Sequence, residues 1–192
     1  MTFDEIIRHF KATGALLDGH FILSSGLHSP NYLQCALALR RPADAQKFGQ
    51  AIAQKFIGQQ FDAVVSPAIG GLIIGFAAAQ SLNIPFFWTE RENGLMTVRR
   101  GFTVEKNERL LVVEDVITTG GSTRECIAAV ERLGGKAAAA ASIIDRSNGA
   151  ADVGVPRVAL ATLEVPTFAP KNCPLCAGGE IAIKPGSRPA PK

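Results

Sequence analysis

The chain has 192 residues and a mass of 20.3 kDa, which suits one domain with a buried core that needs no cross-links. Its hydrophobic content of 47% and charged content of 19% exclude wholesale disorder. A net charge of +3 and a pI near 8.8 suit small anionic ligands. The chain lacks the concentrated basic stripe of a nucleic-acid binder, so we expect no nucleic-acid partner.

The first ten residues, MTFDEIIRHF, predict an amphipathic helix with acids in its first turn. They show no positively charged leader followed by an apolar core. The longest apolar runs, LIIGFAAA and AAAAASII, are shorter than the roughly 20 residues that span a bilayer. We therefore expect a cytoplasmic protein without a membrane segment.

The two ends of the chain differ in pattern from its middle. A hairpin is expected around residues 20–35 and a helix over 42–58, and a segment with Pro, Gly and Cys closes the chain. We expect one domain over 1–192, with a hood or lid from about 1–40 and 165–192 over a core of about 41–164. The final residues, KPGSRPAPK, are expected at the periphery.

The middle of the chain repeats the order strand, glycine loop, helix. The predicted strands cover 61–66, 85–90, 109–115 and 136–145, and the predicted helices between them cover 68–82 and 123–135. This alternation predicts an α/β fold with a central, mainly parallel sheet flanked by helices. Ligands of such sheets bind at the carboxyl ends of the strands.

The stretch VVEDVITTGGSTRE, residues 112–125, places two acids at one of those strand ends. We expect Glu114 and Asp115 where the strand emerges into solvent, because burying both in ionised form is costly. Such a pair accepts hydrogen bonds from vicinal sugar hydroxyls and stabilises positive charge at a nearby carbon. The alternative is that the acids cap a turn and STRE forms a capping box, and for either half alone that is the better interpretation.

The loop after the acids offers backbone N–H groups and hydroxyls at a helix N-terminus, which form a nest for a monophosphate. Its residues are Val116, Ile117, Thr118, Thr119, Gly120, Gly121 and Ser122. Acids and loop together predict a ribose 5-phosphate site. The loop has no Gly-Lys-Ser/Thr sequence, which disfavours a P-loop nucleotide hydrolase, and no G-x-G-x-x-G follows a strand.

VVEDVITTGGS closely resembles the phosphoribosyl diphosphate (PRPP) motif of the type I phosphoribosyltransferases. The resemblance implies that family's fold, with a central parallel sheet, a flexible loop and a hood. It also implies a reaction in which a nitrogen base displaces pyrophosphate from C1 of the ribose, with Mg²⁺ present. Glu114 and Asp115 would then hold the ribose, and few protein groups would contact the Mg²⁺ itself.

Three further stretches, FILSSGLHSPNYLQ, ERENGLMTVRRGF and IIDRSNG, resemble the orotate phosphoribosyltransferases, and the likeness covers nearly the whole chain. It implies orotate and PRPP as substrates, a role in pyrimidine biosynthesis and a homodimer. The residues it assigns to orotate are Ser24, Ser25, Gly26, Tyr32, Thr118 and Arg146. A guanidinium pairs well with a carboxylate or ring carbonyl. A plain hairpin turn, and a salt bridge between Arg146 and Asp145, remain the alternatives.

Two segments are assigned to pyrophosphate by the same resemblance. In PAIGGL, the backbone amides of Ile69, Gly70 and Gly71 would contact it, and Gly70 stands where a lysine is frequent. The polar loop around ERENGLMTVRRGF would close as a mobile lid, with Arg91, Arg99 and Arg100 as the candidate cations. This loop lacks the family's lysines and histidine, which favours electrostatic catalysis by arginines over general acid catalysis.

The four cysteines are expected to stay thiols or bind metal. Cys173 and Cys176 form one C-x-x-C, half of a zinc site, and no nearby histidine completes it. We therefore predict a structural turn and no metal ligands, with a pairing of two such motifs in a dimer as the alternative. The histidines His9, His20 and His28 are scattered, and surface or packing roles are expected.

Two other functions remain open from the sequence. A purine phosphoribosyltransferase would share the PRPP loop but need a different hood. A PRPP-sensing regulator of the same fold would carry an added nucleic-acid-binding element, and none is evident.

Overall fold

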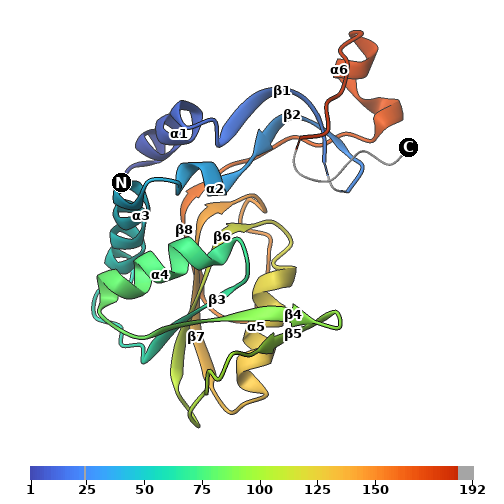
Figure 1. Ribbon diagram of the computed structural model, residues 1–192. Helices are drawn as coiled ribbons and strands as arrows, with labels where there is room; N and C mark the ends of the chain where they lie inside the picture. The colour runs from blue at the N-terminus through green and yellow to red at the C-terminus, as the bar shows by residue number, and fades with distance from the viewer. Residues whose placement is uncertain (24, 186–192) are drawn as a thin grey trace.

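The structure is a computed structural model that describes residues 1–23 and 25–185. Its centre is a six-stranded sheet in the order β5-β4-β3-β6-β7-β8, in which only β5 is antiparallel to its neighbour (Figure 1). The strands are β3 (Ala63–Pro67), β4 (Phe86–Glu92), β5 (Leu95–Val98), β6 (Arg109–Ile117), β7 (Lys136–Asp145) and β8 (Arg157–Thr162). The α/β fold with a mainly parallel sheet is therefore confirmed.

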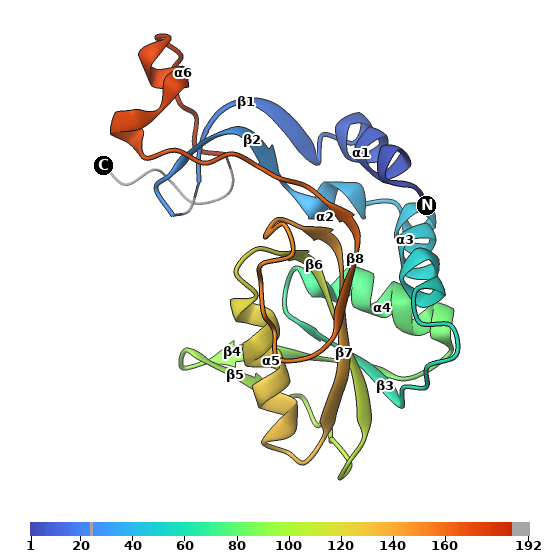
Figure 2. The same ribbon diagram turned by 180° about the vertical axis from the view of Figure 1, so that it is seen from behind.

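Helices cover both faces of this sheet. The helices α3 (Pro42–Gln54) and α4 (Gly71–Leu82) lie on one face, and α5 (Gly121–Glu131) lies on the other (Figures 1 and 2). Alternate residues of β6 serve the two faces, since Leu111 and Val113 pack with α3 and α4 while Leu110 and Val112 pack with α5. Burial on both faces explains why the central strands are continuous apolar runs.

Two glycines allow close packing on the α3 and α4 face. A Cβ added at Gly49 of α3 would overlap the Ala77 carbonyl of α4, and one at Gly75 would overlap the Ser66 hydroxyl of β3. Each glycine therefore brings a helix close to its neighbour. The start of α4 is thereby held beside the end of β3.

The N-terminal region packs against the core through its first helix, where Phe10 lies edge to face with Phe48 of α3. Helix α1 (Phe3–Ala12) begins with a capping box between Thr2 and Glu5 and buries Ile6 and Phe10. The antiparallel pair β1 (Leu16–Ile22) and β2 (His28–Leu33) follows, and then the short helix α2 (Cys35–Ala38).

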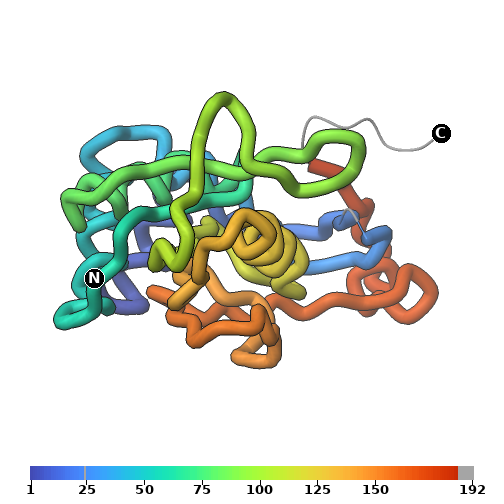
Figure 3. The backbone as a smooth tube through the Cα atoms, turned by 90° about the horizontal axis from the view of Figure 1, so that it is seen from below, coloured from blue at the N-terminus to red at the C-terminus, as the bar shows by residue number. Residues whose placement is uncertain are grey.

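The C-terminal segment, with η1 (Pro170–Asn172) and α6 (Pro174–Ala177), returns to that hairpin (Figures 1 and 3). Phe168 pairs with His28, and Ile183 pairs with Phe21. The β1–β2 hairpin and the C-terminal segment thus meet above the carboxyl ends of the central strands (Figure 1). Their division from the core as a hood stays a prediction.

Two details differ from the sequence expectations. The segment expected as an irregular lid folds in its first half as a hairpin, in which β4 and β5 are joined by Asn93 and Gly94, both at positive φ. The edge strand β8 was not predicted. Among the described residues, no helix combines the length and apolar character needed to cross a membrane.

Candidate active site

A cavity of about 860 Å³ lies between the end segments and the carboxyl ends of β6 and β7. Ser25 and Tyr32 line it from the hairpin side, Thr118 and Thr119 from the loop after β6, and Arg146 from the end of β7. The structure therefore brings together five residues that the sequence assigned to the two substrates. Ser24 lies outside the described residues.

The acidic pair lies deeper than the sequence suggested. Strand β6 continues to Ile117, so Glu114 is only 7% exposed and Asp115 is half-buried, and the expectation that both emerge into solvent is wrong. The reason is that β3 ends early: it pairs with β6 only as far as Val112, and the loop after it folds over the acids.

Burial changes the charge state of this pair. It raises the pKa of Glu114 to about 9, with further contributions from the charge of Asp115 and a hydrogen bond to it. Burial also raises the pKa of Asp115, although the Val116 amide donates a 2.7 Å hydrogen bond to Asp115 Oδ1. Two carboxyls held in this way favour a ligand that brings donors or positive charge.

The loop between β3 and α4 lies directly against the acids. A Cβ added at Gly70 would lie 2.8 Å from Asp115 Oδ1, and one at Gly71 would lie 2.8 Å from the Val113 carbonyl oxygen. Only glycine lets the backbone approach so closely. The amides of Gly70 and Gly71 follow in the same loop at the start of α4, and a helix N-terminus favours anions; the next amide, that of Leu72, donates to the Ile69 carbonyl at 3.2 Å.

The loop after β6 begins α5 through Gly120, whose φ of 75° is left-handed. A Cβ there would lie 2.8 Å from Val153 Cγ1, so this position requires glycine on two grounds. Arg124 of α5 donates from Nη1 to the Thr119 carbonyl at 2.9 Å and fixes the loop. Ile117 is buried and Val116 is half-buried, and both pair with β7, so these two positions belong to the strand and the loop itself starts at Thr118.

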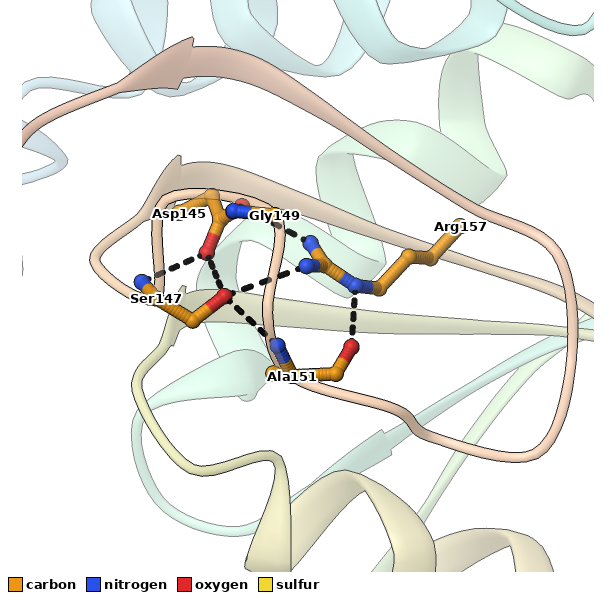
Figure 4. A network of polar contacts seen from close by, with 5 residues as sticks. All are labelled: Asp145, Ser147, Gly149, Ala151 and Arg157. Carbon is orange, nitrogen blue, oxygen red and sulfur yellow. Dashed lines mark hydrogen bonds and ion pairs between the residues drawn. The ribbon is translucent and has the colours of Figure 1, made fainter.

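Arg146 lines the cavity with its Nε buried and without a hydrogen-bond partner among the described residues. Burial lowers the pKa of its guanidinium. The alternative in which Asp145 pairs with Arg146 is wrong, because Asp145 Oδ2 accepts from Arg157 Nη1 at 3.0 Å instead (Figure 4). A half-buried guanidinium that lines a cavity and whose buried Nε has no partner indicates an anionic or carbonyl ligand.

Arg157 belongs to a network that holds the loop after β7 (Figure 4). Asp145 accepts bonds from Ser147 and the Gly149 amide, and Arg157 also donates to Ser147 Oγ and the Ala151 carbonyl. Burial alone would raise the pKa of Asp145, but these hydrogen bonds together hold it below its ordinary value. Because Asp145 is paired with Arg157, it does not pair with Arg146, which lines the cavity.

The three candidate arginines of the hairpin lie outside the described cavity lining and are paired with acids. Arg91 contacts Glu125 of α5, Arg99 lies 3.0 Å from Glu92, and Arg100 lies 2.8 Å from Glu90. All three arginines are exposed or half-exposed. The structure does not bring these arginines to the acidic pair.

Sequence reasoning missed Gln34, Thr167 and Lys184 in the cavity lining. Lys184 comes from the tail that was expected at the periphery, an expectation that is wrong for this residue. The backbone of Ile183 is paired with the His20 carbonyl and the Ile22 amide, and this carries Lys184 to the cavity. The sequence offered no local signal for that long-range pairing.

A second cluster was also missed. His20, His28 and Cys173 are buried, and Cys176 lies beside them with its ligand atoms within 4.8 Å of theirs. The expectation that no histidine accompanies the C-x-x-C is wrong, and of the surface or packing roles expected for His20 and His28, burial leaves packing. The third histidine, His9, is a packing residue whose Nε2 lies 2.8 Å from the Ala38 carbonyl.

A strand that carries paired acids near its carboxyl end, a phosphate-type loop at the next helix and a glycine loop beside them define the phosphoribosyltransferase class. The phosphoribosyl transferase domain family matches residues 39–162, and the chain belongs to this family.

Comparison with individual relatives identifies the subfamily within the phosphoribosyltransferases. The orotate phosphoribosyltransferase of Pelotomaculum thermopropionicum is 51% identical over 98% of this chain and 99% of its own length. That of Caldicellulosiruptor bescii is 50% identical over 98% and 99%. The solved structure of orotate phosphoribosyltransferase from Aeropyrum pernix is 30% identical with a TM-score of 0.70, and covers 82% of this chain and 93% of that one. Within its family, the chain belongs to the orotate phosphoribosyltransferases.

Proposed function

We propose that this protein transfers the ribose 5-phosphate group of PRPP to N1 of orotate, giving orotidine 5′-phosphate and pyrophosphate on the route to UMP. The bond from C1 of the ribose to pyrophosphate breaks, and a bond from C1 to N1 of orotate forms as N1 loses its proton. The observation that supports this best is a cavity lined by Thr118 and Thr119 of the phosphate-type loop and by Arg146, directly after the strand that carries the buried acidic pair.

The PRPP half of the site follows from the two loops. The 5-phosphate would bind the N–H groups and hydroxyls from Thr118 to Ser122 at the start of α5. The pyrophosphate would bind the amides of Ile69, Gly70 and Gly71, which lie next to Asp115. Glu114 and Asp115 would accept hydrogen bonds from the ribose hydroxyls and stabilise positive charge that develops at C1.

Mg²⁺ fits this donor set. Carboxylate oxygens beside a loop that would hold pyrophosphate are the hard ligands that Mg²⁺ prefers, and most of its contacts would come from PRPP and water. When bound, the ion would neutralise charge on the leaving pyrophosphate. The acids orient the ribose whether or not they touch the ion.

Orotate would lie between the hairpin and the end of β7. Arg146 would pair with its carboxylate or a ring carbonyl, and Thr118 would contact its ring. Ser25 and Tyr32, which line the cavity, would cover it together with Gly26, which lies outside that lining. Because the N1 proton is easily lost, positioning and charge carry most of the rate.

Arg91, Arg99 and Arg100 would neutralise the charge of pyrophosphate once the β4–β5 hairpin closes over the site. The ion pairs of Arg91 with Glu125 and of Arg99 with Glu92 are nearly half-exposed on both sides, and exposed pairs are worth only about 0–1 kcal/mol, so a polyanion can replace these acids. Arg100 is itself exposed, although its partner Glu90 is mostly buried. Single changes of Arg99 and Arg100 to Ala should each lower kcat in the turnover assay. An unchanged kcat in both would contradict this role.

The choice of base is tested by comparing substrates. Pyrophosphate release should require PRPP and orotate, and adenine or hypoxanthine should support less than 1% of that rate, about 3 kcal/mol of discrimination. Arg146→Ala should raise the KM for orotate at least tenfold and leave the KM for PRPP nearly unchanged. Equal turnover of a purine would favour the purine alternative, and no release with any base would favour the regulator.

The homodimer also belongs to the proposal. It is supported by an exposed apolar face on α4, which is taken up in the Discussion. A cytoplasmic location stays a prediction.

A further inference from the structure

We propose that this protein binds one zinc ion through His20, His28, Cys173 and Cys176, at the junction of the N-terminal hairpin and the C-terminal segment. The four ligand atoms all lie within 4.8 Å of one another. They come from three parts of the chain: β1, β2 and the turn at α6. The proposal concerns a site separate from the acidic pair and does not rest on the proposed function.

The distances suit a tetrahedral ion. His20 Nε2 lies 2.9 Å from His28 Nδ1, 3.4 Å from Cys173 Sγ and 3.8 Å from Cys176 Sγ, and Cys176 Sγ lies 3.3 Å from His28 Nδ1. With zinc bonds of about 2.0 Å to nitrogen and 2.3 Å to sulfur, tetrahedral ligands lie roughly 3.3–3.8 Å apart. Three of these four separations fall in that range, and the two imidazole nitrogens need to part by a few tenths of an ångström.

The hydrogen bonding fixes the tautomer of His20 that a metal needs. Its Nδ1 lies 3.0 Å from the Glu180 carbonyl oxygen, which can only accept, so Nδ1 carries the proton. In a neutral ring Nε2 then presents a lone pair, and Nε2 is the atom on which the other three ligands converge. A backbone carbonyl that orients a ligating histidine in this way is the usual support of a zinc ligand.

A single hydrogen cannot account for these contacts. One unprotonated nitrogen faces a second ring nitrogen and two thiol sulfurs, and thiols are weak hydrogen-bond donors. A cation at the centre would satisfy all four atoms at once. Cysteine with histidine in a closed, four-ligand set is characteristic of structural zinc, because soft and borderline ligands disfavour Mg²⁺ and Ca²⁺.

The surroundings suit a structural ion. His20, His28 and Cys173 are 4%, 8% and 3% exposed, and only Cys176 reaches the surface. Cys173 begins α6 and Cys176 lies within that one-turn helix, so the C-x-x-C spacing turns both sulfurs to one side. The ion would therefore be held by protein on all four sides, with no position left for substrate.

The position of the cluster indicates that the ion would join the C-terminal segment to the β1–β2 hairpin. The C-terminal segment reaches the hairpin through two isolated backbone pairings, His28 with Phe168 and Phe21 with Ile183 (Figure 2). The cluster lies between these two pairings and would join the segment to both strands. Because Ile183 precedes Lys184 in the cavity lining, zinc would hold that cation over the cavity.

Metal content provides the first test. Full-length protein purified from medium with added zinc, then dialysed, should contain one zinc per chain by elemental analysis. The single variants Cys173→Ser and Cys176→Ser should lose it, whereas the controls Cys126→Ala and His9→Gln, which change residues outside the cluster, should keep it. Wild-type protein without stoichiometric metal, or with a Cys173–Cys176 disulfide instead, overturns the proposal. A stoichiometric metal other than zinc overturns it as well.

Cobalt provides a second test that does not depend on the folding of variants. Wild-type protein loaded with Co²⁺ in place of zinc should show thiolate-to-cobalt charge-transfer bands and intense tetrahedral d–d bands.

Thermal stability provides a third test. Removal of metal with a chelator should lower the thermal midpoint of the wild type but not that of Cys176→Ser. Weak octahedral bands, or equal effects of the chelator on both proteins, would contradict a Cys₂His₂ site.

Discussion

The Glu114 carboxyl lies inside the sheet with 7% of its surface exposed, and its pKa is raised from an ordinary 4.5 to about 9. Burial is the largest cause and the neighbouring Asp115 charge the next. The ligand-free protein therefore holds Glu114 protonated at neutral pH. Binding of a cation or of ribose hydroxyl donors would favour its ionised form, so ligand binding is coupled to proton release.

This pKa predicts how stability depends on pH. Between pH 4.5 and about 9 the folded state keeps a proton that the unfolded state has lost, so the free energy of unfolding falls as pH rises. The slope from this one group is at most about 1.4 kcal/mol per pH unit. Glu114→Gln should remove that contribution and flatten the profile over pH 5–9 in urea titrations.

Glu131→Gln, at the exposed end of α5, is the matched control and should keep the wild-type slope. Some slope should remain in Glu114→Gln, because the pKa of Asp115 is raised too. A profile for Glu114→Gln parallel to that of the wild type would show that Glu114 ionises normally in the folded protein.

At the scale of single residues, the sequence predicted several side chains that line the same cavity, but it did not predict their surroundings. The acids, the Thr and Gly loop and Arg146 were identified because their types suit a sugar phosphate and a carboxylate. The burial of Glu114 depends on where β3 stops, and the freedom of Arg146 depends on Arg157, twelve residues beyond Asp145. Neither is evident from a local pattern.

Among the elements, α4 carries an apolar face without a cover among the described residues. Ile73 and Phe76 are 47% and 59% exposed, and Ile69 in the loop before them is 83% exposed, at a spacing that places all three on one side. The same face borders two cavities, one of about 380 Å³ that Ile73 and Phe76 line and one of about 460 Å³ that Phe76, Trp88 and Phe102 line. A contiguous apolar patch of this kind indicates an interface.

We predict that α4 forms the homodimer interface. Ile73→Glu and Phe76→Glu should each convert a dimer to a monomer in sedimentation velocity, because a buried unpaired charge costs several kcal/mol. Ile57→Glu, which alters another exposed isoleucine beyond the end of α3, should stay dimeric. A monomeric wild type, or dimers that survive both α4 changes, would contradict this assignment.

The elements themselves were predicted well where burial on both faces makes the signal strong. The strands β3, β6 and β7 and the helices α4 and α5 follow apolar runs and glycine loops that are plain in the sequence. The edge strand β8 was missed because its side chains are mostly half-buried and show no clear alternation. The β4–β5 turn at Asn93 and Gly94 was a readable hairpin signal, obscured by the charged residues around it.

At the scale of the whole molecule, the arrangement of the chain ends could not be predicted. His20 and Cys173 are 153 positions apart, and Lys184 reaches the cavity only because Ile183 pairs with β1. Such contacts depend on how the end segments return over the core, and no periodicity or spacing records that path. The sequence did predict that both end segments depart from the alternating pattern of the core. Their contact above the strands is consistent with a cover for the site.

The central claim is that the buried acidic pair on β6 holds the ribose during transfer. The most direct measurement is steady-state pyrophosphate release from PRPP and orotate by the double variant Glu114→Gln/Asp115→Asn, compared with that of the wild type. The thermal midpoint of both proteins is measured as well, to confirm that the variant is folded. We predict that kcat/KM for PRPP falls at least 100-fold, equivalent to about 2.7 kcal/mol of lost transition-state stabilisation. A folded double variant that releases pyrophosphate at the wild-type rate would contradict the account.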